Sequence, residues 1–130
     1  MFTIEQIQEA HRKVKSGADF PKYVQELKLL GVSYYDCFVA NGQTKYYNSI
    51  GFEVVGGAKY PALKVNDVSS AEKLKQAITI HQQGKTDYLT FCMQSADAGV
   101  EKWTVDIMEM SVSYLDKGGE ELVVEPIPQK

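Results

Sequence analysis

The feature that most constrains the fold is an internal similarity between the two halves of the chain. Displacing the sequence by 68 residues aligns Asp19 with Asp87, Gly31 with Gly99, Val32 with Val100, Tyr46 with Tyr114, Gly51 with Gly119, Glu53 with Glu121 and Val55 with Val123. A displacement of 67 adds Glu5 with Glu72, Ala10 with Ala77 and Gly17 with Gly84. These 10 identities in 52 pairs exceed the roughly three expected by chance. We therefore expect two tandem repeats, about residues 3–61 and 69–128, within a single domain of residues 1–130.

Each half is predicted to start with two helices. Thr3 and Gln6 have the spacing of a capping box, which predicts a helix that continues to Gly17. Its counterpart in the second half begins at Ser69 or Ser70 and ends at Gly84. The second helix of each half begins at an aspartate, whose carboxylate suits the positive end of a helix. These helices run from Asp19 to Gly31 and from Asp87 to Gly99, where glycine allows a left-handed exit.

Three strands follow the helices in each half. The alternation of apolar residues over 100–107 and the turn at Asn41-Gly42 indicate antiparallel hairpins. The other expected strands are 35–39, 44–47, 52–55, 111–114 and 121–125, and residues 62–67 connect the halves as a loop or with a short strand. The predicted fold class is α+β, built from two α-α-β-β-β repeats with pseudo-twofold symmetry. Its sheet is mostly antiparallel, with helices on one face.

Composition excludes several classes of function. Fourteen basic and seventeen acidic residues give a formal charge of −3, which argues against a nucleic-acid partner. No apolar run approaches the 18 residues of a membrane span, and the first residues do not have the pattern of a signal peptide. We expect a cytoplasmic protein without a cofactor. Cys37 and Cys92 are expected to be free thiols, and no metal site is expected because the histidines and cysteines lack ligand spacing.

Several runs of the sequence resemble a known family along nearly the whole chain. They are Ser16–Pro21 (SGADFP), His81–Tyr88 (HQQGKTDY), Gly99–Trp103 (GVEKW) and Val124–Pro128 (VEPIP). Together they resemble the bacterial domain-of-unknown-function family 1398, whose members are often labelled "phage envelope protein". The resemblance implies a compact α+β protein and no established reaction, cofactor or catalytic residue. Ser95 stands where many members have a second cysteine, three residues after Cys92.

His81, Asp87 and Cys92 are the candidate catalytic residues. His81 lies on the apolar side of its predicted helix and would act as a base if it reached Asp87 or Cys92. The favoured alternative is a partly buried histidine bonded within the last turn of the helix. Cys92 aligns with Val24 and Cys37 with Val105, which favours packing over catalysis for both thiols.

The candidate ligand-binding residues are Trp103, Tyr34 and Tyr47. Strand alternation cannot bury both residues of the Tyr34-Tyr35 or Tyr46-Tyr47 pairs, so one of each must point outward or into a groove. Outward tyrosines form a plausible partner surface, although cross-strand pairing alone also accounts for them. A homodimer through a sheet face or edge is one such use.

These observations leave three functional hypotheses. The leading one is a non-catalytic binding or protein-interaction domain, because no catalytic constellation is complete. The second is a small-molecule sensor or enzyme with a site between the repeats near His81. A phage-related structural protein is the third, and it rests on the family label alone. Whether any catalysis occurs is left open.

Overall fold

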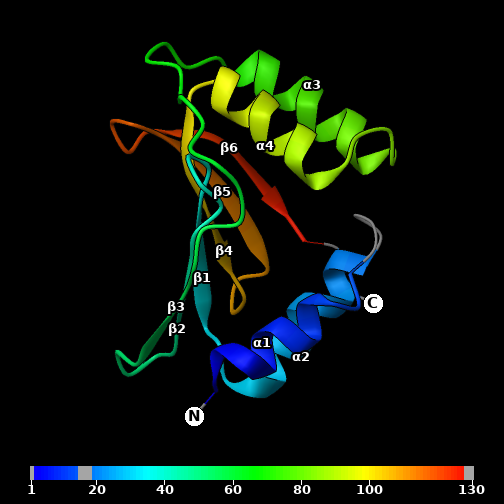
Figure 1. The fold of residues 1–130 in the computed structure, drawn as a ribbon, viewed down its shortest axis with the longest axis vertical. Coiled ribbons are helices and arrows are strands. Elements are labelled where there is room, and N and C mark those ends of the chain that lie inside the picture. Colours follow the sequence, from blue (N-terminus) through cyan, green and yellow to red (C-terminus); the bar gives the residue numbers. More distant parts are fainter. Residues whose placement is uncertain (1, 15–18, 128–130) are drawn as a thin grey trace.

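The computed structural model describes residues 2–14 and 19–127. Its elements in chain order are α1 (Ile4–His11), α2 (Phe20–Leu30), β1 (Tyr34–Phe38), β2 (Thr44–Tyr47), β3 (Glu53–Gly56), α3 (Ala71–Gln82), α4 (Tyr88–Asp97), β4 (Val100–Asp106), β5 (Ser111–Asp116) and β6 (Glu121–Pro126). One sheet stands beside two helical pairs, α1–α2 and α3–α4, which both lie on the same face of it (Figure 1). The predicted α+β class is therefore confirmed.

All strand pairings in the sheet are antiparallel. The strand order is β3-β2-β1-β4-β5-β6, so β1 and β4 meet at its centre. Asp36 of β1 lies opposite Thr104 of β4, and these two residues are separated by the same 68 positions as the sequence similarity. The register is consistent with a duplication, which itself stays a prediction.

Local chemistry sets the helix ends. The capping box at Thr3 is present, with the Gln6 amide 3.2 Å from the Thr3 hydroxyl. Ser70 is the N-cap of α3. Gly31 and Gly99 have the expected left-handed backbone, with φ of 101° and 86°.

Two helix predictions need adjustment. Helix α1 ends at His11, earlier than predicted, and the expected stop at Gly17 lies outside the described residues. Asp19 occupies the N-cap position of α2, but its side chain makes no capping hydrogen bond.

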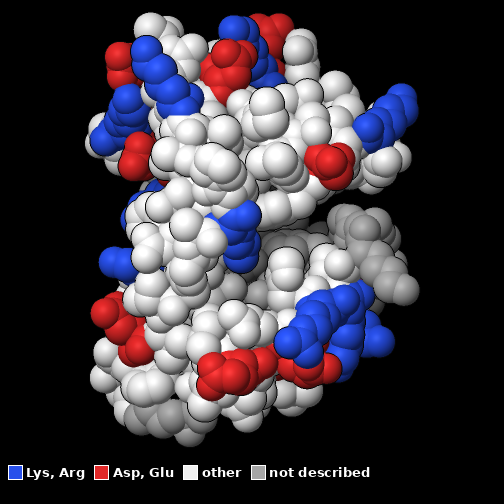
Figure 2. All heavy atoms as spheres, in the orientation of Figure 1, with Lys and Arg blue, Asp and Glu red and all other residues white. Residues whose placement is uncertain are grey.

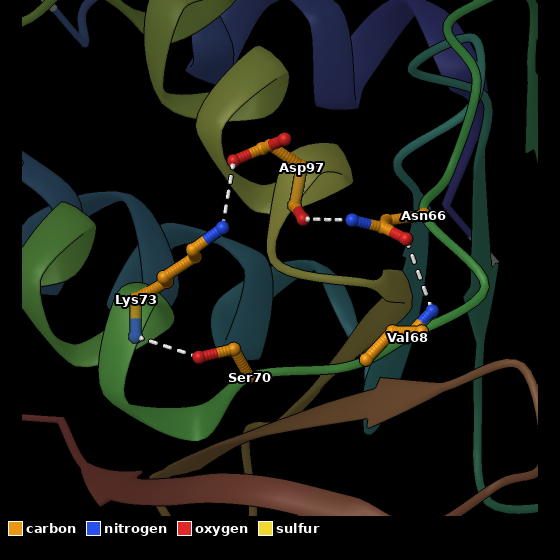
Figure 3. A network of polar contacts seen from close by, with 5 residues as sticks. All are labelled: Asn66, Val68, Ser70, Lys73 and Asp97. Atoms are coloured by element: carbon orange, nitrogen blue, oxygen red, sulfur yellow. Dashed lines mark hydrogen bonds and ion pairs between the residues drawn. The ribbon is translucent and has the colours of Figure 1, made fainter.

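The connector between the halves is a loop tied to the second helical pair. Residues 62–67 contain no strand. Asn66 donates a side-chain hydrogen bond to the Asp97 carbonyl (3.0 Å) and accepts one from the Val68 amide (3.0 Å), as Figure 3 shows. Lys73, whose amide is capped by Ser70, reaches the Asp97 carboxylate at 3.7 Å. These contacts fix the start of α3 against the end of α4.

The core lies between the helices and the inner face of the sheet. Leu27 of α2 and Leu74 of α3 have no exposed surface, and strand alternation buries Tyr35, Cys37 and Val105 opposite them. The strand residues that alternate with the inward ones point away from all four helices. No helix of the described chain is long and apolar enough to cross a membrane.

Candidate functional site

His81 is held by the turn that follows its own helix. Its Nδ1 atom lies 3.1 Å from both the carbonyl oxygen and the hydroxyl of Thr86. The ring stacks on Phe91 of α4, with 4.6 Å between ring centroids and 17° between planes. These contacts fix the ring locally, much as the favoured alternative anticipates. The partner is the Thr86 turn rather than the last helical carbonyls.

Asp87 caps helix α4. Its carboxylate accepts a hydrogen bond from the Thr90 amide at 2.8 Å, and hydrogen bonding by Thr90 holds the pKa of this exposed carboxyl below its ordinary value. His81 adds a weaker electrostatic influence. The hydrogen bonds of His81 and Asp87 therefore go to different partners, Thr86 and Thr90 respectively.

Cys92 belongs to a cluster of two buried thiols and two partly exposed tyrosines. The Cys37 sulfur lies 3.2 Å from the Tyr88 hydroxyl. Burial raises the pKa of Cys37 to about 11 and also raises the pKa of Cys92, whereas Tyr60 and Tyr88 both act to lower the pKa of Cys92. Tyr60 donates to the Val39 carbonyl at 2.6 Å, which anchors the cluster to the sheet. Protonated, enclosed thiols are poor nucleophiles.

The structure does not bring the three catalytic candidates together. His81 contacts Thr86, Asp87 contacts Thr90, and Cys92 interacts with Tyr60 and Tyr88. A nucleophile–base pair requires a shared hydrogen bond, which these contacts do not provide. The described residues also contain no group of three or more His, Cys, Asp or Glu side chains that could hold a metal ion.

The candidate ligand-binding residues lie on opposite sides of the sheet. Trp103 is only 7% exposed on the inner face, where it packs in a ring of Tyr88, Phe91 and Tyr114. Tyr34 and Tyr47 stack on the other side, with 4.5 Å between centroids and 14° between planes. Tyr34 remains 39% exposed, so this stacked pair is accessible and Trp103 is not.

The accessible tyrosines are part of a larger surface, which we call the outer face. It consists of the strand residues that point away from the helices. They are Tyr34, Asp36 and Phe38 of β1, Lys45 and Tyr47 of β2, Glu53 and Val55 of β3, Lys102, Thr104 and Asp106 of β4, Ser111, Ser113 and Leu115 of β5, and Val124 of β6.

A polar network lies at the centre of the outer face. Asp36 is nearly buried there, accepting a 2.6 Å hydrogen bond from Thr104 and lying 3.6 Å from the Lys102 ammonium. Lys45 and Lys102 each place their ammonium 5.8 Å from the centre of the Phe38 ring. The sequence reading missed these residues because their contacts depend on the pairing of β1 with β4.

Charge is unevenly distributed along the strands of this face. Strand register places Glu53 and Asp106 at the level of the tyrosine stack. Lys45 and Lys102 lie further along the strands, at and beyond the level of Asp36. Glu53 and Asp106 therefore lie at one end of the outer face, beside the tyrosine stack. Lys45 lies at the central level of Asp36, and Lys102 lies at the other end with Phe38, where Glu121 of β6 is the nearest acidic strand residue.

The fold defines a small α+β protein whose antiparallel sheet has one face covered by helices. The family described as Protein of unknown function (DUF1398) matches residues 8–126, and the chain belongs to this family. The chain is also similar to the uncharacterised protein YcgX of Escherichia coli strain K12. The two are 24% identical over 107 residues, which cover 82% of this chain and 80% of YcgX.

Proposed function

We propose that the chain is a non-catalytic interaction domain that pairs with a second copy of itself through the outer face. The observation that carries this proposal is the exposed apolar surface of that face. The stacked pair includes Tyr34, which is 39% exposed. Val55 (44% exposed) and Val124 (54% exposed) add apolar surface on the two edge strands β3 and β6. Aromatic residues of this kind are enriched in protein interfaces.

The charge pattern supports a second copy as the occupant. When two identical faces meet, their twofold axis lies in the plane of the interface. If that axis runs across the strands, the end of each copy with Glu53 and Asp106 meets the end of the other copy with Lys102. If it runs along the strands, acidic residues meet acidic residues. The arrangement with the axis across the strands is the electrostatically complementary one, so the charge distribution of the outer face favours it.

The size of the face predicts a modest affinity. Six strands spaced about 4.8 Å apart, each offering about five residues of 3.4 Å, give a plane of roughly 490 Å² per copy. Two copies would bury on the order of 1,000 Å², near the lower limit for a specific interface. Self-association is therefore expected at high micromolar rather than nanomolar concentration.

Sedimentation velocity over a concentration series tests this proposal. The wild-type chain is expected to change from monomer to dimer, and added salt should weaken the dimer. Lys45→Glu reverses a charge on the outer face and should abolish dimerisation. Lys22→Glu makes the same change in net charge on the exposed surface of α2 and should leave it intact. A monomer at every concentration, a species larger than a dimer, or equal behaviour of the two variants would contradict the proposal.

A further inference from the structure

The helix side of the molecule contains a recess that no sequence motif indicated. It lies between α1 and the segment that leaves β3, and its volume is about 450 Å³. Ile4, Ile7 and Tyr46 supply apolar walls, with Thr44 and Gln8 beside them. Figure 2 shows a hollow between the two helical pairs, with a basic side chain beside it, whereas the recess itself is lined by α1, β2 and residues 56–59. Pockets for small ligands have volumes in this range.

The charges around the recess are of one sign. Lys59 and Arg12 supply the positive charge, His11 lines the recess with a lowered pKa that favours its neutral ring, and the lining residues include no aspartate or glutamate. This contrasts with the formal charge of −3 of the whole chain. Arg12 does contact Glu9 outside the recess, at 2.7 Å, but both side chains are well exposed. A pair of this kind is weak and leaves the guanidinium available to a ligand.

The backbone opposite α1 is also suited to an anion. Gly56, Gly57 and Ala58 line this wall, and Gly57 and Ala58 are exposed. The amides of Gly57 and Ala58 donate to no backbone carbonyl of the described residues. A Cβ atom at Gly56 would lie 2.6 Å from the Thr44 hydroxyl, so a larger residue here would have to displace the Thr44 side chain. Free N–H groups beside cationic side chains form a favourable setting for carboxylate or phosphate oxygens.

We propose that this recess binds a small organic anion, with its carboxylate or phosphate at Lys59, Arg12 and the amides of residues 57–58 and its apolar body against Ile4 and Tyr46. The two parts of such a ligand match the two kinds of lining. The recess and the outer face lie on opposite sides of the sheet, so this site is independent of self-association.

The environment of His11 agrees with an anionic ligand. Burial and, after it, the positive charge of Lys59 lower the pKa of His11. The ring also contacts Tyr23 of α2 edge-on, at 5.4 Å between centroids. An anion next to Lys59 would offset the positive charge there. The bound state should therefore raise the pKa of His11, which NMR titration of its ring protons can follow.

Titration of the ¹⁵N-labelled chain with simple probes tests the proposal. Phenyl phosphate and benzoate carry the expected anion and an apolar ring, phenol lacks the charge, and inorganic phosphate lacks the ring. For ligands this small we expect a Kd of about 1 mM for at least one aromatic anion, and much weaker binding of phenol and inorganic phosphate. The amide chemical shifts of α1 and of residues 56–59 should change on binding, and those of β5 and β6 should stay the same.

Matched variants assign the site. Lys59→Met keeps most of the aliphatic side chain and removes its charge. It should raise the Kd for the aromatic anion at least tenfold. Lys64 is an exposed lysine of the connector (residues 62–67), outside the recess, and the Lys64→Met variant should bind the anion as the wild type does. Ala58→Phe fills the recess from an exposed position and serves as a second test if Lys59→Met does not fold. Failure of both aromatic anions to bind at about 20 mM, equal binding of phenol, or wild-type affinity in both recess variants would overturn the proposal.

Discussion

The buried thiols allow a quantitative test of the conclusion that Cys37 and Cys92 pack rather than react. With a pKa of about 11, Cys37 is about 3 × 10⁻⁴ thiolate at pH 7.5. An unfolded thiol with the ordinary value of 9.0 is about 3 × 10⁻² thiolate at this pH. The pKa alone therefore slows reaction about 100-fold. Enclosure slows it further, because Cys37 is 2% exposed and Cys92 has no exposed surface.

The assay is the rate of thiol labelling by an aromatic disulfide reagent at pH 7.5, without denaturant and in urea. The unfolded chain should react at both cysteines, and the folded chain at least 100-fold more slowly. His81→Ala should not change the folded rate, because the ring contacts Thr86 and Phe91. Rapid labelling of folded Cys92 that is lost in His81→Ala would refute this reasoning and restore a nucleophile–base pair.

Four further predictions concern stability, measured by urea unfolding. Gly99→Ala should lower the free energy of unfolding by about 2–4 kcal/mol, because φ at Gly99 is 86° and the new Cβ would lie 2.6 Å from the Cα atom of Ser69. A loss below about 1 kcal/mol would contradict that geometry. Thr104→Val should lower the free energy of unfolding by about 1–2 kcal/mol, because it removes the hydroxyl that donates to Asp36. Thr104→Ser keeps that hydroxyl and should recover most of the loss. Equal stability of the two variants would show that the hydrogen bond does not contribute. Ser95→Ala should raise the free energy of unfolding by about 1 kcal/mol, since the buried Ser95 hydroxyl has no hydrogen-bond partner among the described residues. A lower free energy of unfolding in this variant would show that the hydroxyl does have a partner. Burial raises the pKa of several core tyrosines above 10, so the folded chain holds these protons more tightly than the unfolded chain. Stability should therefore fall as the pH rises through 10, and equal urea midpoints at pH 8 and pH 11 would contradict this.

Features that depend on local chemistry could be predicted from the sequence. The capping box at Thr3, the cap at Asp87 and the left-handed glycine at Gly99 each follow from a few neighbouring residues. Alignment with Val105 placed Cys37 on the inward strand face, and Cys37 is buried. Trp103, a candidate ligand-binding residue, is buried as well. Strand alternation also indicated that one tyrosine of each adjacent pair would point outward, which holds for Tyr34 and Tyr47 of the outer face.

Features that depend on distant pairing could not be predicted in this way. The burial of Asp36 requires Thr104 and Lys102, which the β1–β4 pairing brings beside it. The recess joins residues of α1 to Gly56–Lys59, and neither segment carries a recognisable motif. His81 is an intermediate case. Its Thr86 partner is five residues away, so a search for nearby hydroxyl groups would have found it.

The most direct test of the interaction-domain account is to map which amides respond to protein concentration. Spectra of the ¹⁵N-labelled wild-type chain at about 20 μM and about 1 mM bracket the affinity expected for so small an interface. We predict shifts concentrated in β1, β2 and β4, around Tyr34, Lys45 and Lys102, and their loss in Lys45→Glu. Identical spectra at the two concentrations, or changes confined to the helices α3 and α4, would contradict pairing through the outer face.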